Sequence, residues 1–208
     1  MAREQPRFEG GGRSREIVEP RASASLLLLR GGDDALEVLL VQRTPKARFM
    51  GGFWVFPGGA VDPADHAGTD DDGAHRAAAV RELAEETAVE GVDPAALVVY
   101  SRWVTPEGAA IRFDTRFFLA HAPEGAEPRV DGEECVDVGW FAPRAALDAY
   151  DRGDLPLVFP TLKHFEAIAA FGSATALVED SRDRIVEPVR PQVIGDRIVL
   201  PGEPGYVD

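Results

Sequence analysis

Three glutamates near the middle of the chain could act together if the segment that carries them is helical. Glu82, Glu85 and Glu86 fall within five consecutive residues, and at about 100° per residue a helix places all three carboxylates on one face. Arg81, four residues before Glu85, is the basic residue best placed to offset their repulsion. Converging carboxylates suit a hard divalent cation such as Mg²⁺ or Mn²⁺. An acidic helix face exposed to solvent is the alternative that the spacing leaves open.

The composition around these acids predicts a helix packed on a sheet. Residues 74–90 are rich in Ala, Leu, Glu and Arg, and Asp70, Asp71 and Asp72 precede them as caps that suit the helix dipole. Apolar runs predict strands at 23–30, 35–43, 97–104, 111–122 and 136–141, and further helices at 143–150 and 161–171, the last capped by Thr161. Residues 44–59 are typical of a Gly- and Pro-rich connection, and the C-terminal stretch allows a small hairpin across Gly195-Asp196. The mixed order predicts one α/β sheet between helices.

Length, charge and cysteine content limit the class of protein. The 208 residues suffice for one domain with extensions. With 22 basic and 36 acidic residues the formal charge is −14, which argues against binding to nucleic acid or an anionic membrane. No run approaches the ~20 apolar residues of a membrane span, and the single Cys135 excludes an intramolecular disulfide. We therefore expect a soluble cytoplasmic protein with a disordered leader at residues 1–18.

The segment from Gly59 to Val89 resembles the Nudix box, G-x5-E-x7-R-E-U-x-E-E-x-G-U with U aliphatic. The match is close from Arg81 onward, where the chain reads R-E-L-A-E-E-T-A-V. Asp65 replaces a glutamate of the motif and Ala88 replaces a glycine, and 15 residues rather than seven separate Asp65 from Arg81. The eight extra residues, about 66–73, are expected to form a loop insertion that leaves the acidic helix whole.

The resemblance implies a Nudix α/β/α fold over residues 19–158, with 159–208 as a C-terminal helix and tail packed on the domain. It implies hydrolysis of a nucleoside diphosphate linked to another moiety, assisted by Mg²⁺ or Mn²⁺, which neutralise the diphosphate and activate a water. The residues assigned to the ions are Glu82, Glu85, Glu86 and the carbonyl of Gly59. Arg81 would orient Glu85 by an ion pair. The proton of the water needs a carboxylate base, for which the candidates are Glu82, Glu133 and Glu134.

Residues upstream of the box narrow the substrate. Leu39 to Thr44, Arg48, Gly52 and Phe56-Pro57-Gly58-Gly59 resemble the signature L-L-T-x-R-(S/A)-x3-R-x3-G-x3-F-P-G-G of coenzyme A-cleaving Nudix enzymes, with Val41 and Thr44 as departures. The resemblance implies coenzyme A or acyl-coenzyme A as substrate, cleaved to 3′,5′-ADP and phosphopantetheine. Arg43, Arg48 and Arg112 are candidates to clamp phosphates, and Phe56 to contact the substrate. Ion pairs with the many acids are the alternative for these arginines.

Other substrates and another class of protein stay open. Within the enzyme class the alternatives are ADP-ribose, NADH, dinucleoside polyphosphates and an oxidised nucleoside triphosphate. RNA ends are disfavoured because the charge is −14 and no basic stripe is present. A sensor that keeps the fold without catalysis would not need three crowded acids, and magnesium-dependent turnover would distinguish it. Because members of the family commonly form homodimers, the resemblance implies a homodimer. The apolar stripe formed by Leu162, Phe165, Ile168 and Ala169 could pack on the domain or on a second subunit.

Overall fold

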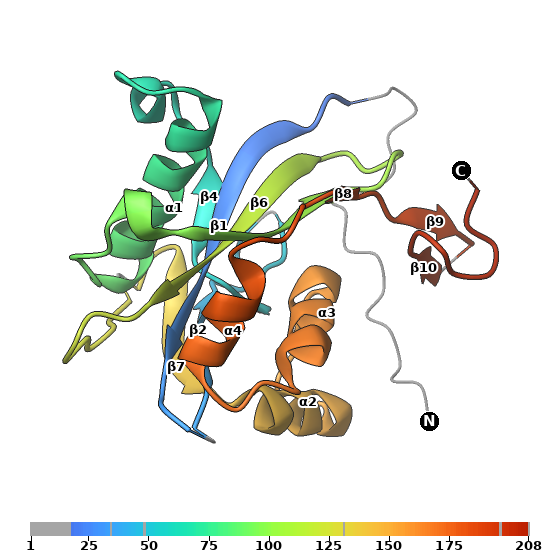
Figure 1. The fold of residues 1–208 in the computed structure, drawn as a ribbon. Helices are drawn as coiled ribbons and strands as arrows, with labels where there is room; N and C mark the ends of the chain where they lie inside the picture. Colours follow the sequence, from blue (N-terminus) through green and yellow to red (C-terminus); the bar gives the residue numbers. More distant parts are fainter. Residues whose placement is uncertain (1–17, 34, 48, 131, 196, 208) are drawn as a thin grey trace.

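The computed structural model describes residues 18–33, 35–47, 49–130, 132–195 and 197–207 (Figure 1). Its strands are β1 (Arg21–Arg30), β2 (Glu37–Arg43), β3 (Trp54–Val55), β4 (Gly58–Ala60), β5 (Val98–Val104), β6 (Phe113–His121), β7 (Cys135–Phe141), β8 (Pro188–Val189), β9 (Gln192–Ile194) and β10 (Arg197–Val199), and its helices are α1 (Asp71–Thr87), α2 (Pro143–Arg152), α3 (Phe159–Ile168) and α4 (Ala174–Ser181). Apart from Val18, the expected leader lies outside the described residues. In the part of the chain described, no helix is long and apolar enough to cross a membrane.

The first eight strands form one mixed sheet in the order β3-β2-β1-β6-β5-β8, with β4 paired to β1 and β7 paired to β2. Strand β1 lies at its centre, parallel to β6 and antiparallel to β2 and β4. Strands β9 and β10 form the small C-terminal hairpin that the sequence predicts. The expected α/β architecture is therefore confirmed.

Helices cover both faces of the sheet, with α1 on one side and α2, α3 and α4 on the other (Figure 1). The side chains of β1 show how both faces of the sheet are buried. Leu26 and Leu28 pack with the α1 residues Ala78 and Leu83, whereas Leu27 and Leu29 point into the core that α2 to α4 complete. A strand buried on both faces needs a continuous apolar run rather than alternation, which is what the sequence of β1 supplies.

The central strands β1 and β2 separate along their length. They pair only at Leu29 with Val38 and at Arg30 with Glu37. Beyond these pairs β1 continues against β4 and β6, while β2 continues against β7 and β3. The sheet is thus split toward the start of β1, and the segment that joins β3 to β4 lies in the split. Leu26 closes the junction by donating its amide to the Pro57 carbonyl at 2.9 Å.

Helix α1 begins earlier than the sequence predicts. Asp70 is the N-cap, accepting the amide of Gly73 at 2.9 Å, and Asp71 and Asp72 occupy the first turn. The expected loop at 66–73 is therefore wrong for its last three residues, 71–73, which are helical, and the segment does not line the pocket described below. The helix ends at Thr87 rather than at residue 90. The extra residues lengthen the helix at its N-terminus because the cap at Asp70 satisfies its first amides.

Ala88, which ends α1, gives a simple test of this helix boundary. It adopts a left-handed conformation with φ +56°, which costs a residue with a Cβ more than it costs glycine. We expect Ala88→Gly to raise the free energy of unfolding by about 1 kcal/mol, measured by urea denaturation. Ala84→Gly in the helix interior should lower it by a similar amount. A destabilising Ala88→Gly would contradict the assigned cap.

The C-terminal helices differ from the prediction. Helix α3 begins at Phe159, so Thr161 is a buried residue inside it and the expected cap is wrong; Val158 is the N-cap, and Pro160 suits the first turn. The expected end at residue 171 is also late, since the helix stops at Ile168. Helix α4 was not predicted: it is short, capped by Ser173, and held by burial of Leu177 and Val178.

Candidate functional site

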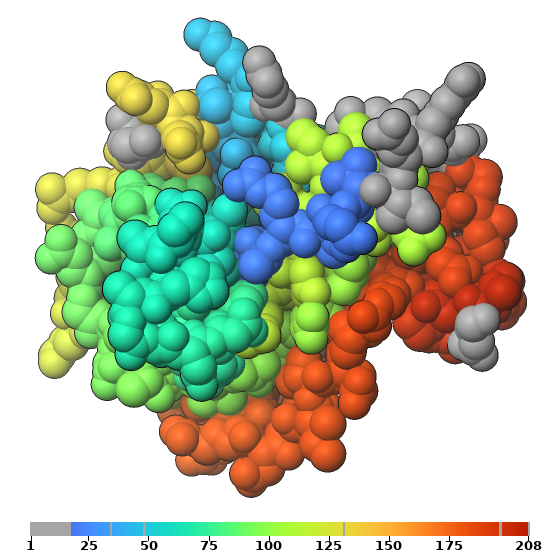
Figure 2. All heavy atoms as spheres, turned by 90° about the horizontal axis from the view of Figure 1, so that it is seen from above, coloured from blue at the N-terminus to red at the C-terminus, as the bar shows by residue number. Residues whose placement is uncertain are grey.

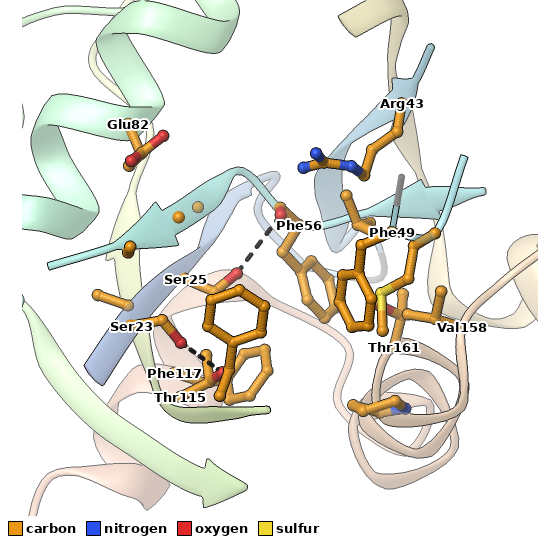
Figure 3. Close-up of a pocket in the computed structure, with 18 of the residues that line it drawn as sticks. Ser23, Ser25, Arg43, Phe49, Phe56, Glu82, Thr115, Phe117, Val158 and Thr161 are labelled. Carbon is orange, nitrogen blue, oxygen red and sulfur yellow. Dashed lines mark hydrogen bonds between the residues drawn. The ribbon is translucent and has the colours of Figure 1, made fainter. Parts of the chain in front are cut away.

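A pocket of about 350 Å³ opens where β1 and β2 separate (Figure 3). The acids that line it are Glu82, Glu86 and Glu134, the cations are Arg21 and Arg43, the hydroxyls include Ser23, Ser25, Thr115 and Thr161, and the rings are Phe49, Phe56, Phe113 and Phe117. In Figure 3, Glu82 lies on one side, the phenylalanines lie on the other, and the Arg43 guanidinium points into the space between them. The pocket thus has an acidic end and an aromatic end.

Arg81 is the centre of an ion-pair network at the acidic end. Its Nε and Nη2 donate to the two carboxylate oxygens of Asp65 at 3.1 and 3.0 Å, and Nη2 also donates to the Ala60 carbonyl at 3.0 Å. Its Nη1 donates to Glu82 at 2.9 Å and to Glu85 at 3.0 Å. The hydrogen bonds and charges of Asp65 and Glu82 raise the pKa of Arg81 above its usual value, although burial opposes the shift. Arg81 therefore joins the Asp65 turn, β4 and the acidic helix, and fixes two of the three predicted acids.

Glu86 is not on the exposed helix face that the spacing suggests. Only 4% of the residue is exposed, because α1 packs against β4 and turns this carboxylate toward the strand. Its Oε2 accepts the Gly58 amide at 3.0 Å, and its Oε1 accepts the thiol of Cys135 at 3.6 Å. Burial raises the pKa of Glu86 to about 7, against the lowering effects of the Gly58 amide and of nearby Arg43. A fully solvated acidic face is therefore excluded.

Glu82 is held close to Gly59, the first residue of the box. A Cβ on Gly59 would approach Glu82 Oε1 to 2.2 Å, so the backbone of β4 and this carboxylate can meet only because residue 59 is glycine. Burial raises the pKa of Glu82 despite the hydrogen bond from Arg81, and the charges of Glu85 and Glu134 raise it further. Glu82 and Glu86 are thus two crowded, partly desolvated carboxylates at one end of one pocket.

The chemistry of these donors fits a hard divalent cation. A positive ion between Glu82 and Glu86 would relieve the repulsion and desolvation that raise both pKa values. Among the described residues, however, no three His, Cys, Asp or Glu side chains already converge as a metal cage. Glu82 and Glu86 line the pocket, whereas Glu85 pairs with Arg81 at 3.0 Å and does not line it. A site of this kind leaves coordination positions for water and phosphate, as Mg²⁺ prefers.

The other predicted residues fall into two groups. Arg43, Phe56, Gly59 and Glu134 line the pocket, whereas Glu85, Glu133 and Arg112 do not, and Arg48 lies outside the described residues. Arg43 stands out because its Nε is buried and has no hydrogen-bond partner among the described residues. A buried guanidinium N–H without a partner carries a desolvation cost that a ligand oxygen would remove.

Arg112 stabilises the backbone beside the pocket. It is only 8% exposed, and its guanidinium donates to the backbone carbonyls of Thr105 at 3.1 Å and Val18 at 2.7 Å. These bonds tie the segment before β1 to the end of β5. The guanidinium therefore braces the wall of the pocket instead of facing a substrate.

Several pocket residues were not identified from the sequence. Phe49 and Phe113 meet at the aromatic end with ring centroids 5.6 Å apart. Ser23 and Thr115 share a hydrogen bond of 2.6 Å across β1 and β6. The sequence indicates these residues only through the alternation of side chains between the two faces of each strand. This alternation shows which side chains share the pocket face only once the β1–β6 register is known.

Comparison with known proteins agrees with this architecture. A family model described as NUDIX domain matches residues 19–161, more than half of the chain. A Caenorhabditis elegans protein carrying the name nudix hydrolase 7 is 25% identical over 230 residues, 90% of this chain and 75% of that protein. A NUDIX hydrolase of Alicyclobacillus acidocaldarius has a TM-score of 0.67 and 30% identity over 77% of this chain and 96% of its own. The NUDIX domain of Shewanella oneidensis NrtR, solved in complex with ADP ribose, has a TM-score of 0.53 and 23% identity over 72% and 86%.

Proposed function

The chain belongs to the Nudix hydrolase family of enzymes, which act on phosphorus-containing anhydrides, and we propose that it hydrolyses the diphosphate of coenzyme A or acyl-coenzyme A. The products are 3′,5′-ADP and phosphopantetheine or its acylated form. The observation that carries this proposal is that the upstream signature and the acidic helix contribute to the same pocket. Arg43, Phe56 and Gly59 from the signature line it together with Glu82 and Glu86 from the helix.

The roles of the residues follow from their environment. Glu82 and Glu86, with Glu85 as a further carboxylate nearby, would hold the divalent ion, Mg²⁺ or Mn²⁺. When bound, the ion neutralises the diphosphate and lowers the pKa of a water. Arg81 positions Glu82 and Glu85. Arg43 supplies its unpartnered Nε to a phosphate oxygen, where charge accumulates during the reaction.

The reaction is a hydrolysis at phosphorus. A water oxygen forms a new bond to one phosphorus, and the bond from that phosphorus to the bridging oxygen breaks. The proton of the water passes to a carboxylate. The candidates for this base are Glu82 and Glu134, because both line the pocket. Glu133 is the less suitable base because it does not line the pocket. A homodimer and a cytoplasmic location stay predictions, and neither enters this mechanism.

A substrate panel tests the proposal. We expect the purified chain with Mg²⁺ to cleave coenzyme A and acetyl-coenzyme A with a kcat/KM at least about tenfold above that for ADP-ribose, NADH and diadenosine tetraphosphate, and EDTA to stop the reaction. The ratio corresponds to about 1.4 kcal/mol of transition-state binding. Preference for ADP-ribose, the ligand of the Shewanella domain, would retain the mechanism and overturn the substrate. Tight ADP-ribose binding without turnover of any compound would favour a sensor.

A further inference from the structure

The aromatic end of the pocket contains a cation that no step of the proposed hydrolysis uses. Arg21, the first residue of β1, lines the pocket, and its side chain has no ion pair or hydrogen bond with the described residues. Its backbone is fixed, because its amide donates to the Arg112 carbonyl at 2.9 Å. An arginine that faces a substrate pocket and has no acidic partner among the described residues is available for an anion.

Arg21 belongs to a ladder that runs along the pocket. Strands β1 and β6 are parallel and in register, so Arg21 pairs with Phe113, Ser23 with Thr115, and Ser25 with Phe117. Residues two apart along a strand point to the same face, and all six of these residues line the pocket. Figure 2 shows the beginning of β1, in blue, at the surface between α1 and the start of β6.

The ladder separates Arg21 from the acidic end. Ser25 lies opposite Gly58, whose amide binds Glu86, and four residues of extended strand span about 13 Å. Phe113, beside Arg21, forms with Phe49 the aromatic surface of this end. A ligand that reaches from the acids to Arg21 therefore meets a ring-binding surface and a positive charge at its far end.

The three hydroxyls of this ladder already have hydrogen-bond partners. Ser23 and Thr115 bond to each other, and Ser25 donates to the Pro57 carbonyl at 3.0 Å. The middle of the pocket therefore offers few unsatisfied groups to a hydroxyl-rich sugar, and discrimination depends on its charged and aromatic ends.

We propose that Arg21 binds a phosphomonoester on the nucleoside end of the substrate, the 3′-phosphate of coenzyme A, while the base contacts Phe49 and Phe113. This inference rests on the proposed function, because it assumes that the diphosphate lies at the acidic end. Arg21 then takes the phosphate-binding role that the sequence suggested for Arg112. Arg112 supports it indirectly, because it ties Val18, three residues before Arg21, to Thr105, which lines the pocket.

The test compares coenzyme A with dephospho-coenzyme A, which lacks only the 3′-phosphate. A charge-assisted hydrogen bond contributes about 10- to 100-fold to binding, so kcat/KM for coenzyme A should exceed that for dephospho-coenzyme A by this factor. Arg21→Gln should abolish the preference by raising KM for coenzyme A alone, and Arg21→Lys should restore part of it. Arg144→Gln, the same charge change at an exposed position of α2, should leave the preference intact.

Binding of the product gives a readout independent of turnover. By calorimetry with the full chain and Mg²⁺, 3′,5′-ADP should bind about tenfold or more tightly than AMP, and Arg21→Gln should equalise the two. Equal handling of coenzyme A and dephospho-coenzyme A by the wild type, or an undiminished preference in Arg21→Gln, would overturn the role of Arg21 while leaving the hydrolase assignment in place. If neither compound is cleaved, and AMP and 3′,5′-ADP bind equally, the proposed function and this inference both fail.

Discussion

Replacing Glu86 by glutamine is expected to reduce hydrolysis by about 10³-fold or more and, in the metal-free protein at neutral pH, to increase stability. Glutamine retains the size of the side chain and can still accept the Gly58 amide. It cannot supply the negative charge that holds a divalent cation beside the diphosphate, and loss of that charge removes a large electrostatic contribution to the transition state.

The stability change follows from the sign of the pKa shift. Burial raises the pKa of Glu86 to about 7, so between its ordinary value near 4.5 and 7 the folded protein binds more protons than the unfolded chain. Stability therefore falls as pH rises through this window. Glutamine has no such dependence, and Glu86→Gln should be more stable than wild type by about 2–3 kcal/mol at pH 8 and by little at pH 4.

Urea denaturation of the metal-free proteins at several pH values measures this difference, and initial rates measure the loss of activity. Glu90→Gln is the matched control, because Glu90 is exposed just after the same helix and should alter neither quantity. Added Mg²⁺ should stabilise wild type and have little effect on Glu86→Gln. An active Glu86→Gln enzyme would show that this carboxylate is not part of the catalytic site.

Replacing Arg81 by methionine is expected to destabilise the protein by about 3 kcal/mol and to lower kcat/KM by about 100-fold or more. The substitution keeps the aliphatic stem but removes the cation shared by Asp65, Glu82 and Glu85. Asp65 suffers most, because its side chain is only 5% exposed. A buried carboxylate that loses its partner must be left uncompensated or become protonated.

The pH dependence separates this cause from a general loss of packing. Burial alone raises the pKa of Asp65, but the bonds from Arg81 and from the Asp62 amide outweigh it and hold the pKa below its ordinary value. The ion pair therefore contributes stability that is present above about pH 4 and is lost as pH falls. The deficit of Arg81→Met should shrink in acid. Arg76→Met, which removes a cation paired with Asp72 on the same helix, should cost less and retain activity.

The sequence predicts the elements that bury apolar side chains well. The continuous run Leu26–Leu29 indicates a strand covered on both faces, and the acids 70–72 indicate the region where α1 begins, although the helix starts at Asp71 and not at residue 74. Short elements carry too little signal: β3 and β4 have two and three residues and exist only because β2 and β1 supply their partners. Helix α4 likewise depends on tertiary burial of a few side chains.

Within the site, the motif identifies the acids, but it does not give their orientation. Helical spacing alone groups Glu82, Glu85 and Glu86, whereas the rotation of α1 about its axis is set by packing of apolar residues such as Ala78 and Leu83 on the sheet. This rotation buries Glu86 and leaves Glu85 exposed. The sequence also does not show whether Arg112 or Arg21 faces the pocket. Only the β1–β6 register reveals that Arg21 lines it.

The most direct test of the central claim is to identify the bond that is cleaved. Acetyl-coenzyme A is incubated with the enzyme and Mg²⁺ in ¹⁸O-labelled water, and the products are analysed by mass spectrometry. We predict equal amounts of 3′,5′-ADP and acetyl-phosphopantetheine, with one ¹⁸O atom in the phosphate of one product and none in the acetyl group. Labelled acetate with intact coenzyme A, or no labelled phosphate in any product, would contradict the account.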